Sequence, residues 1–232
     1  MARISSGSKV FDTLLKGGYE TDAITTIFGP AGAGKTTTCI LAAVQASKDG
    51  KKVIYVDTEG GFSLERFNQV ASDTNGILNN IIFLRPATFE EQQRDFEKLR
   101  DLIRPPVGLV IIDTIAMLYR LEMGARIDPA EVNRDLAKQI AFLTEIARKK
   151  EIPVLITNQG YSFFDDRDKT HMVGGDVMRY GSKCIIELQI APDRKRRAIL
   201  RKHRSIAEGT ESLFEIKAFG FVDVKDSKFR LF

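Results

Sequence analysis

The chain has 232 residues, of which 43% are hydrophobic and 28% are charged, and it carries a net charge of +4. This composition excludes a chain that is disordered throughout, and the length favours one large domain, residues 1–232, over two small ones. Two cysteines and two histidines are too few for a disulfide framework or a zinc site, and no apolar run approaches the roughly 18 residues that span a membrane, so we expect a cytoplasmic protein.

Short runs of apolar and β-branched residues alternate with helical patterns along most of the chain. The runs are nearly continuous, which is typical of strands that are buried on both faces in a parallel sheet. The predicted strands are Ile24–Phe28, Val53–Asp57, Ile81–Leu84, Leu109–Asp113 and Val154–Thr157. The predicted helices between them are Thr36–Lys48, Phe89–Ile103 and Pro129–Lys150.

Two of these helices begin with capping signals. Thr88 with Glu91 forms a capping-box pattern before the second helix, and Asp128 is placed to cap the third, with Pro129 in its first turn. These signals fix where the two helices start.

The pattern changes after Thr157. Cys184–Ile190 and Arg197–His203 are strand-like and are connected by a turn at Pro192-Asp193, and Leu213–Ala218 supplies a further strand. We therefore expect an α/β fold with a mostly parallel central sheet flanked by helices, which continues into a C-terminal antiparallel extension.

Residues 29–36 match G-x-x-x-x-G-K-[ST], the phosphate-binding loop, between a predicted strand and a predicted helix. Glycines let successive backbone N–H groups point at phosphate oxygens, Lys35 reaches the β- and γ-phosphates, and the Thr36 hydroxyl ligates Mg²⁺. The candidate nucleotide-binding residues of this segment are Gly29, Pro30, Ala31, Gly32, Ala33, Gly34, Lys35, Thr36 and Thr37.

Polar side chains follow three other strands. Asp113 comes after four apolar residues, and beside a phosphate loop such an aspartate holds Mg²⁺; the alternative is a helix cap. Asp57 and Glu59 lie two residues apart, so on an extended chain they share a face, and a carboxylate here can deprotonate an attacking water. Polar residues that merely end the strand remain an alternative, more so for Asp57. Gln159 is a candidate γ-phosphate sensor or a solvated turn residue.

Together these motifs resemble those of the RecA/RadA recombinase family, and within it the archaeal RadB paralogues. The segments that carry the resemblance are residues 29–37, 55–63 with Glu65 and Arg66, 109–113, 157–159 and 202–204. By this resemblance Glu59 is the catalytic base, Asp113 the Mg²⁺ carboxylate and Gln159 the γ-phosphate sensor. Arg66 matches the arginine that stacks on the adenine ring. The implied fold is a RecA-type P-loop NTPase core.

The resemblance also assigns the basic tract near the C-terminus. Lys202 and Arg204 match a Lys-x-Arg that reaches the γ-phosphate in a neighbouring subunit. On a regular strand these two share one face, and Arg201 and His203 share the other, which predicts a nucleotide role for the first pair and a DNA or solvent role for the second. We expect no N-terminal helix-hairpin-helix domain and no Phe-x-x-Ala motif, and therefore at most a weak homo-oligomer.

Two stretches, Tyr119–Asp128 and Gly160–Gly181, lie where this family places its DNA-contacting loops. The second is long and lacks apolar periodicity, and its aromatic residues alternate with basic ones, which suits single-stranded DNA; a lid over the nucleotide is the alternative. The candidate DNA-contacting residues are Arg120, Arg126, Tyr161, Phe163, Arg167, Lys169, Arg179 and Arg201.

The sequence therefore predicts a slow ATPase that uses ATP and Mg²⁺, binds DNA, preferably single strands, and assists homologous recombination and DNA repair. Its expected partners are other recombination proteins, such as a RadA-type recombinase or a junction nuclease, and its expected place is the nucleoid. Two alternatives are a KaiC-like regulatory ATPase without a DNA role and a small-molecule P-loop kinase, which would need an acceptor pocket.

Overall fold

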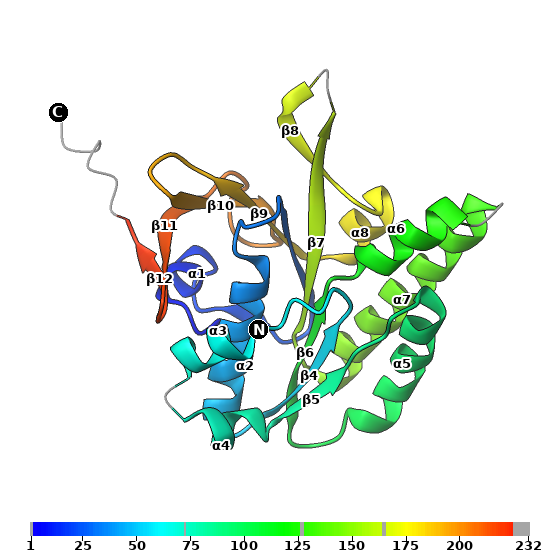
Figure 1. The fold of residues 1–232 in the computed structure, drawn as a ribbon, viewed down its shortest axis with the longest axis horizontal. Coiled ribbons are helices and arrows are strands. Elements are labelled where there is room, and N and C mark those ends of the chain that lie inside the picture. Colours follow the sequence, from blue (N-terminus) through cyan, green and yellow to red (C-terminus); the bar gives the residue numbers. More distant parts are fainter. Residues whose placement is uncertain (1, 72, 126–127, 164–165, 225–232) are drawn as a thin grey trace.

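The structure is a computed structural model that describes residues 2–71, 73–125, 128–163 and 166–224, with side chains described outside residues 162–170. A sheet of ten strands runs through it, in the order β12-β11-β10-β9-β3-β7-β6-β4-β5, with β8 paired to β7 (Figure 1). Six of these strands are parallel to one another. They are β3 (Ile24–Gly29), β4 (Lys52–Asp57), β5 (Ile81–Leu84), β6 (Val107–Asp113), β7 (Val154–Phe163) and β9 (Cys184–Ile190).

Helices cover both faces of the parallel strands (Figure 1). One face packs against α1 (Lys9–Leu14), α2 (Lys35–Lys48), α3 (Leu64–Val70) and α4 (Thr74–Leu78). The other packs against α5 (Phe89–Leu102), α6 (Ala116–Ala125), α7 (Pro129–Lys150) and α8 (Gly175–Gly181). Successive residues of β6 alternate between the two cores: Leu109 lies in the first, and Val110 in the second. Because both sides are buried, the strand reads as a continuous apolar run.

The sheet continues beyond β9 as an antiparallel extension. Its strands are β10 (Lys195–Lys202), β11 (Glu211–Lys217) and β12 (Gly220–Asp223). A small separate sheet pairs β1 (Arg3–Ile4) with β2 (Tyr19–Glu20). No helix of the described ranges combines the length and the apolar character needed to cross a membrane.

The predicted α/β fold, with its mostly parallel sheet and antiparallel extension, is confirmed. The predicted caps are also present: the Thr88 hydroxyl accepts from the Glu91 N–H at 3.1 Å, and the Asp128 carboxylate accepts from the Ala130 N–H at 2.9 Å.

The prediction of an irregular segment over 160–181 is wrong. β7 continues to Phe163, pairs with β8 (Asp166–Met172) as a hairpin that stands out from the body, and is followed by α8 (Figure 1). The hairpin is held by backbone pairing, for example Gly160 with Met172, which does not need an apolar alternation. Likewise Tyr119 and Arg120 lie within helix α6, not in a loop.

Candidate nucleotide-binding site

The carboxyl ends of the central parallel strands meet at one edge of the sheet. The register pairs Gly29 at the end of β3 with Gln159 on β7, and Asp57 at the end of β4 with Asp113 at the end of β6. In open α/β sheets, ligands bind outside the carboxyl ends of the strands. The fold therefore gathers the predicted phosphate loop and the predicted polar side chains at one place.

A cavity of about 430 Å³ lies in front of the phosphate-binding loop. Its lining comes from the loop, from three strand ends and from β11: Gly29, Ala31, Gly32, Gly34, Lys35, Thr36, Thr37, Glu59, Thr114, Gln159, Gly160 and Ile216. Pro30 and Ala33, also predicted here, shape the loop instead: the Ala33 N–H donates to the Pro30 carbonyl at 3.3 Å. The loop thus forms one wall of a pocket that also contains carboxylate and amide side chains.

Strand β9 and the antiparallel extension pack against the loop. A Cβ at Gly29 would lie 2.3 Å from the Leu188 carbonyl oxygen on β9, and one at Gly34 would lie 3.0 Å from Ile216 on β11. Both glycines have φ in the left-handed or extended positive range, at 155° and 106°. The motif glycines therefore serve close packing against β9 and β11 as well as the curl of the loop.

Lys35 begins helix α2 and turns its ammonium into the loop. Nζ donates to the carbonyl oxygens of Gly29 at 2.9 Å and Pro30 at 2.8 Å. Burial lowers the pKa of Lys35, and the nearby carboxylates of Glu59 and Asp113 oppose that shift. The loop therefore holds a cation at the cavity wall, where phosphate groups would be neutralised.

Asp113 is buried at the end of β6, and neighbouring hydroxyls hold its carboxylate. The Tyr55 hydroxyl donates to Oδ2 at 2.9 Å, and the Thr157 hydroxyl donates to Oδ1. Burial raises the pKa of Asp113, whereas these bonds and one from Thr36 act in the opposite direction. The Thr36 hydroxyl thus lies beside this carboxylate, and the pair supplies the hard oxygen ligands that Mg²⁺ prefers.

Glu59 lies at the cavity and is held by two side chains. Its Oε1 accepts from Gln159 Nε2 at 2.7 Å and from the Thr114 hydroxyl at 3.1 Å. Gln159 in turn accepts from Arg120 of helix α6. A continuous set of hydrogen bonds therefore connects α6 to the carboxylate. Thr114 was not predicted as a site residue, because only the pairing of β4 with β6 brings it to Glu59.

The expectation that Asp57 and Glu59 share a face is wrong. The chain turns after Asp57, whose two carboxylate oxygens accept from the backbone N–H groups of Gly61 at 3.0 Å and Phe62 at 3.2 Å. Asp57 organises that turn and Glu59 faces the cavity.

Arg66 lies on α3 beside the turn between β11 and β12. Its Nη1 donates to the Ala218 carbonyl at 2.8 Å and to Gln69 at 2.9 Å, and it does not line the cavity. Its buried Nη2 has no hydrogen-bond partner in the described part of the chain. Ile216 of the same hairpin lines the cavity, two positions along the chain from Ala218, the contact of Arg66.

The basic tract at β10 does not divide into two faces as expected. The pairing of β10 with β9 shifts register between Leu200 and Lys202, and the strand ends at Lys202. Beyond that end, His203 and Arg204 both lie at the buried Glu20 carboxylate, at 3.9 Å and 2.7 Å. The regular alternation on which the prediction rested is therefore absent there.

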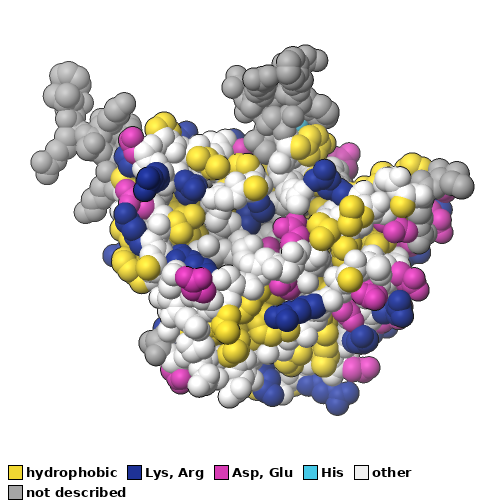
Figure 2. All heavy atoms as spheres, in the orientation of Figure 1, with side chains coloured by type: hydrophobic (Ala, Val, Ile, Leu, Met, Phe, Trp, Pro, Cys, Tyr) yellow, Lys and Arg dark blue, Asp and Glu magenta, His cyan; other side chains and the backbone are white. Residues whose placement is uncertain are grey.

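Lys202 and Arg201 also have partners within the chain. Lys202 Nζ donates to the Arg179 carbonyl at 2.6 Å, and Arg201 Nε donates to the buried Glu187 carboxylate at 2.6 Å. Burial lowers the pKa of Lys202. Lys and Arg side chains nevertheless gather on the surface over β10 and β11 (Figure 2).

Replacing Arg204 by alanine is expected to lower the free energy of unfolding by about 2 kcal/mol at pH 7, because the buried Glu20 loses a charged partner. Arg204 also pairs with Asp22, and their hydrogen bond holds the pKa of Asp22 below its ordinary 3.8. The stability contributed by the Arg204–Asp22 pair is present above pH 3.8, and it is lost as the pH falls through the lower pKa that Asp22 has in the folded chain. Urea unfolding at pH 7 and at lower pH measures both effects; equal stability at pH 7 would contradict the structural role.

The predicted DNA-contacting residues are only partly described. Tyr161 on β7 is 44% exposed and its ring lies 5.8 Å from that of His171, and Arg179 is exposed on α8. Arg126, and the side chains of Phe163, Arg167 and Lys169, lie outside the described part of the structure. A hollow of about 480 Å³ between α6 and the hairpin is lined by Tyr119, Arg120, Met123, Tyr161 and Val173. Arg120 therefore borders this hollow and also contacts Gln159.

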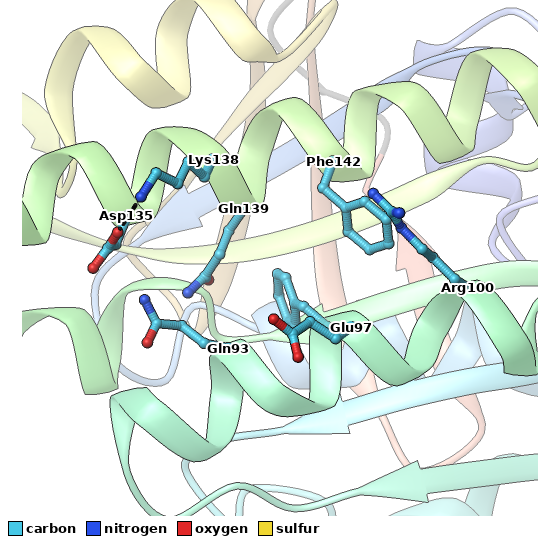
Figure 3. A pocket seen from close by; sticks show the side chains of 8 residues that line it. Gln93, Glu97, Arg100, Asp135, Lys138, Gln139 and Phe142 are labelled. Carbon is cyan, nitrogen blue, oxygen red and sulfur yellow. Dashed lines mark hydrogen bonds and ion pairs between the residues drawn. The ribbon is translucent and has the colours of Figure 1, made fainter.

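A larger hollow, of about 590 Å³, lies elsewhere, between α5 and α7 (Figure 3). There Lys138 pairs with Asp135 at 3.0 Å, and the Arg100 guanidinium lies 5.0 Å from the centre of the Phe142 ring. Its lining contains no glycine-rich loop, so it lacks the donors that a polyphosphate needs. Size alone thus does not identify the nucleotide site.

Comparison with known proteins agrees with this geometry. The family model described as Rad51 matches residues 1–224. The chain is 41% identical over 218 residues to "DNA repair and recombination protein RadB" of Methanobrevibacter smithii, covering 91% of this chain and 92% of that protein. It is 41% identical over 220 residues to the protein of the same name from Methanococcus maripaludis, covering 94% and 100%. A solved structure described as "Crystal structure of the RadB recombinase" superposes with a TM-score of 0.82 at 34% identity, covering 96% of this chain and all of that one.

Proposed function

The chain belongs to the Rad51 family of recombination ATPases, and from this premise we propose that it binds ATP and Mg²⁺, hydrolyses ATP slowly, and binds DNA to assist homologous recombination and repair. The observation that carries the proposal is the convergence of the phosphate loop, Glu59 and Asp113 on one cavity at the carboxyl edge of the sheet. Mg²⁺, held by Thr36 and Asp113, would neutralise phosphate charge when it is bound.

In the proposed reaction, the chain binds the polyphosphate and removes a proton from water. The loop N–H groups and Lys35 hold the phosphates. Glu59 accepts the proton of the attacking water, which the Gln159 amide helps to place next to the γ-phosphate. Arg66, whose Nη2 has no hydrogen-bond partner among the described residues, stacks on the adenine ring.

The proposed slow turnover is supported by the contacts that two cations make within their own chain. Lys202 and Arg204, proposed to act on a neighbouring subunit's nucleotide, are both bound within their own chain. They would have to exchange these partners on assembly, so an isolated chain lacks the extra cation that accelerates phosphoryl transfer. ATP then acts mainly as a switch: loss of the γ-phosphate alters Gln159, and Arg120 passes the change to α6.

We place DNA at the side of the molecule formed by α6, the β7–β8 hairpin and α8. Tyr161 offers an exposed ring for stacking on bases, and Arg120 and Arg179 offer cations for phosphates, which favours single strands. The partners fitting this role are a RadA-type recombinase or a junction nuclease, at the nucleoid in the cytoplasm. Phe163, Arg167, Lys169, Arg126 and Arg201 complete the proposed DNA-contacting set.

The decisive experiment measures single-stranded DNA binding with and without ATP, at several salt concentrations, together with phosphate release and sizing at several protein concentrations. Log affinity is expected to fall with log salt by about 0.7 for each phosphate contact on single strands. Phosphate release without any acceptor favours an ATPase over the small-molecule kinase. Absence of salt-sensitive DNA binding would instead favour the KaiC-like regulatory ATPase.

A further inference from the structure

One arginine of the antiparallel extension reaches the phosphate-binding loop. Arg196, the second residue of β10, donates from Nε to the carbonyl oxygen of Gly32 at 3.1 Å. The two residues are 164 positions apart in the chain. Gly32 lines the nucleotide cavity, whereas Arg196 approaches the loop from the extension. This contact belongs to neither the motif nor the mechanism described above.

The contact fixes one peptide plane of the loop from both ends. The carbonyl of Gly32 and the N–H of Ala33 belong to the same planar trans peptide, so they point in opposite directions. Arg196 binds the carbonyl, while the Ala33 N–H donates to the Pro30 carbonyl at 3.3 Å. Gly32 has φ 73°, and a Cβ there would meet no atom of the described residues within 4 Å, so packing does not hold this residue in place. The arginine supplies the restraint that packing does not.

The same guanidinium also holds the turn that precedes β10. Its Nη1 donates to the carbonyl oxygens of Arg194 at 3.0 Å and Lys195 at 2.9 Å. Asp193 and Arg194 in that turn adopt left-handed φ of 58° and 59°, a conformation that L-residues adopt at a cost. Arg196 therefore joins a strained turn and the phosphate loop through one planar group with diverging donors.

We propose that Arg196 is a positioning residue for nucleoside di- and triphosphates: it orients the Gly32–Ala33 peptide so that the loop keeps the shape that binds phosphate. The inference rests on the proposed ATP-binding function and adds a residue to it from outside the motif. Because Arg196 acts on the phosphate-binding loop alone, its loss should weaken the binding of ligands that carry phosphates. The affinity for a nucleoside without phosphates should not change.

Three variants distinguish the effect of the positive charge at position 196 from that of the guanidinium geometry. Arg196→Ala removes both the charge and the guanidinium. Arg196→Lys keeps the charge but replaces the diverging donors with a single ammonium, which cannot reproduce the bridge. Arg197→Ala removes the same charge from the adjacent position, where Arg197 lies 3.8 Å from Glu211 on the neighbouring strand. The thermal midpoint of each variant without nucleotide reports whether the fold is retained.

The test is the dissociation constant for ATP, ADP and adenosine, measured by calorimetry on the full chain. We expect Arg196→Ala and Arg196→Lys to weaken ATP and ADP binding by about tenfold, the effect of losing one charge-assisted hydrogen bond, and to leave adenosine binding within about twofold. Arg197→Ala should resemble the wild type for all three ligands.

Three results would overturn the inference while leaving the proposed function standing. If Arg196→Ala binds ATP with wild-type affinity, Arg196 has no positioning role. If Arg196→Lys binds ATP with wild-type affinity, only the positive charge matters and not the geometry of the guanidinium. If Arg196→Ala loses affinity for ATP and for adenosine equally, or if a lowered thermal midpoint explains the loss of affinity for both ligands, Arg196 has only a structural role. Failure of the wild-type chain itself to bind ATP would overturn the proposed function, and this role with it.

Discussion

Replacing Lys35 by alanine is expected to weaken ATP binding by about 100-fold while leaving the fold intact. Lys35 Nζ lies inside the loop, on the carbonyl oxygens of Gly29 and Pro30, and not in either hydrophobic core. Bound phosphates would lose two charge-assisted hydrogen bonds from this ammonium, each contributing about 1.5 kcal/mol or more. At about 1.4 kcal/mol for each factor of ten, the loss reaches two orders of magnitude.

Calorimetric titration with ATP measures this effect, with Lys48→Ala as the matched control. Lys48 ends the same helix, is exposed and lies at the end remote from the loop, so its replacement removes equal charge without touching the cavity. The dissociation constant of Lys48→Ala for ATP should match that of the wild type. ATP binding by Lys35→Ala at wild-type strength would disprove the assignment of the cavity as the nucleotide site.

Replacing Glu59 by glutamine is expected to reduce kcat for ATP hydrolysis by about 100- to 10,000-fold, the contribution of a positioned general base. ATP affinity should stay within about twofold, because the amide oxygen still accepts from Gln159 and from Thr114. An amide has the shape of the carboxyl group but cannot take the proton from water. Phosphate release under saturating ATP measures the change.

Glu65→Gln is the control for this substitution. Glu65 is an exposed carboxylate in the first turn of α3, six positions along the chain, and it does not line the cavity. The Glu65→Gln variant should hydrolyse ATP at the wild-type rate. If Glu59→Gln also retained wild-type turnover, the base would have to be another group.

The central fold was predictable because its signals are local. Strands buried on both faces need apolar residues at nearly every position, so β6 appears in the sequence as one uninterrupted run that ends in Asp113. The loop glycines and Lys35 form a motif of fixed spacing, and Thr88 and Asp128 mark their helices by capping. In each case, neighbours within a few positions determine the structure.

What escaped prediction depends on partners that are distant along the chain. Arg204 reads as a free cation until Glu20 and Asp22 are brought to it, 184 and 182 residues away. Arg196 belongs to none of the motifs in the sequence, and it reaches the phosphate loop only because β10 folds against that loop. The β7–β8 hairpin was missed for a different reason, since backbone pairing specifies it and side-chain alternation does not.

The packing of the extension against the phosphate loop sets when during synthesis the site can exist. Residues 29–36 are synthesised before β7 and β9, the sheet partners of β3, and Arg196, which binds Gly32, follows Gly32 by 164 residues. At bacterial to eukaryotic elongation speeds this interval is on the order of 10 s. A nascent chain therefore carries the complete motif before β10 and β11 exist, and these strands supply Arg196 on the loop and Ile216 in the lining of the cavity.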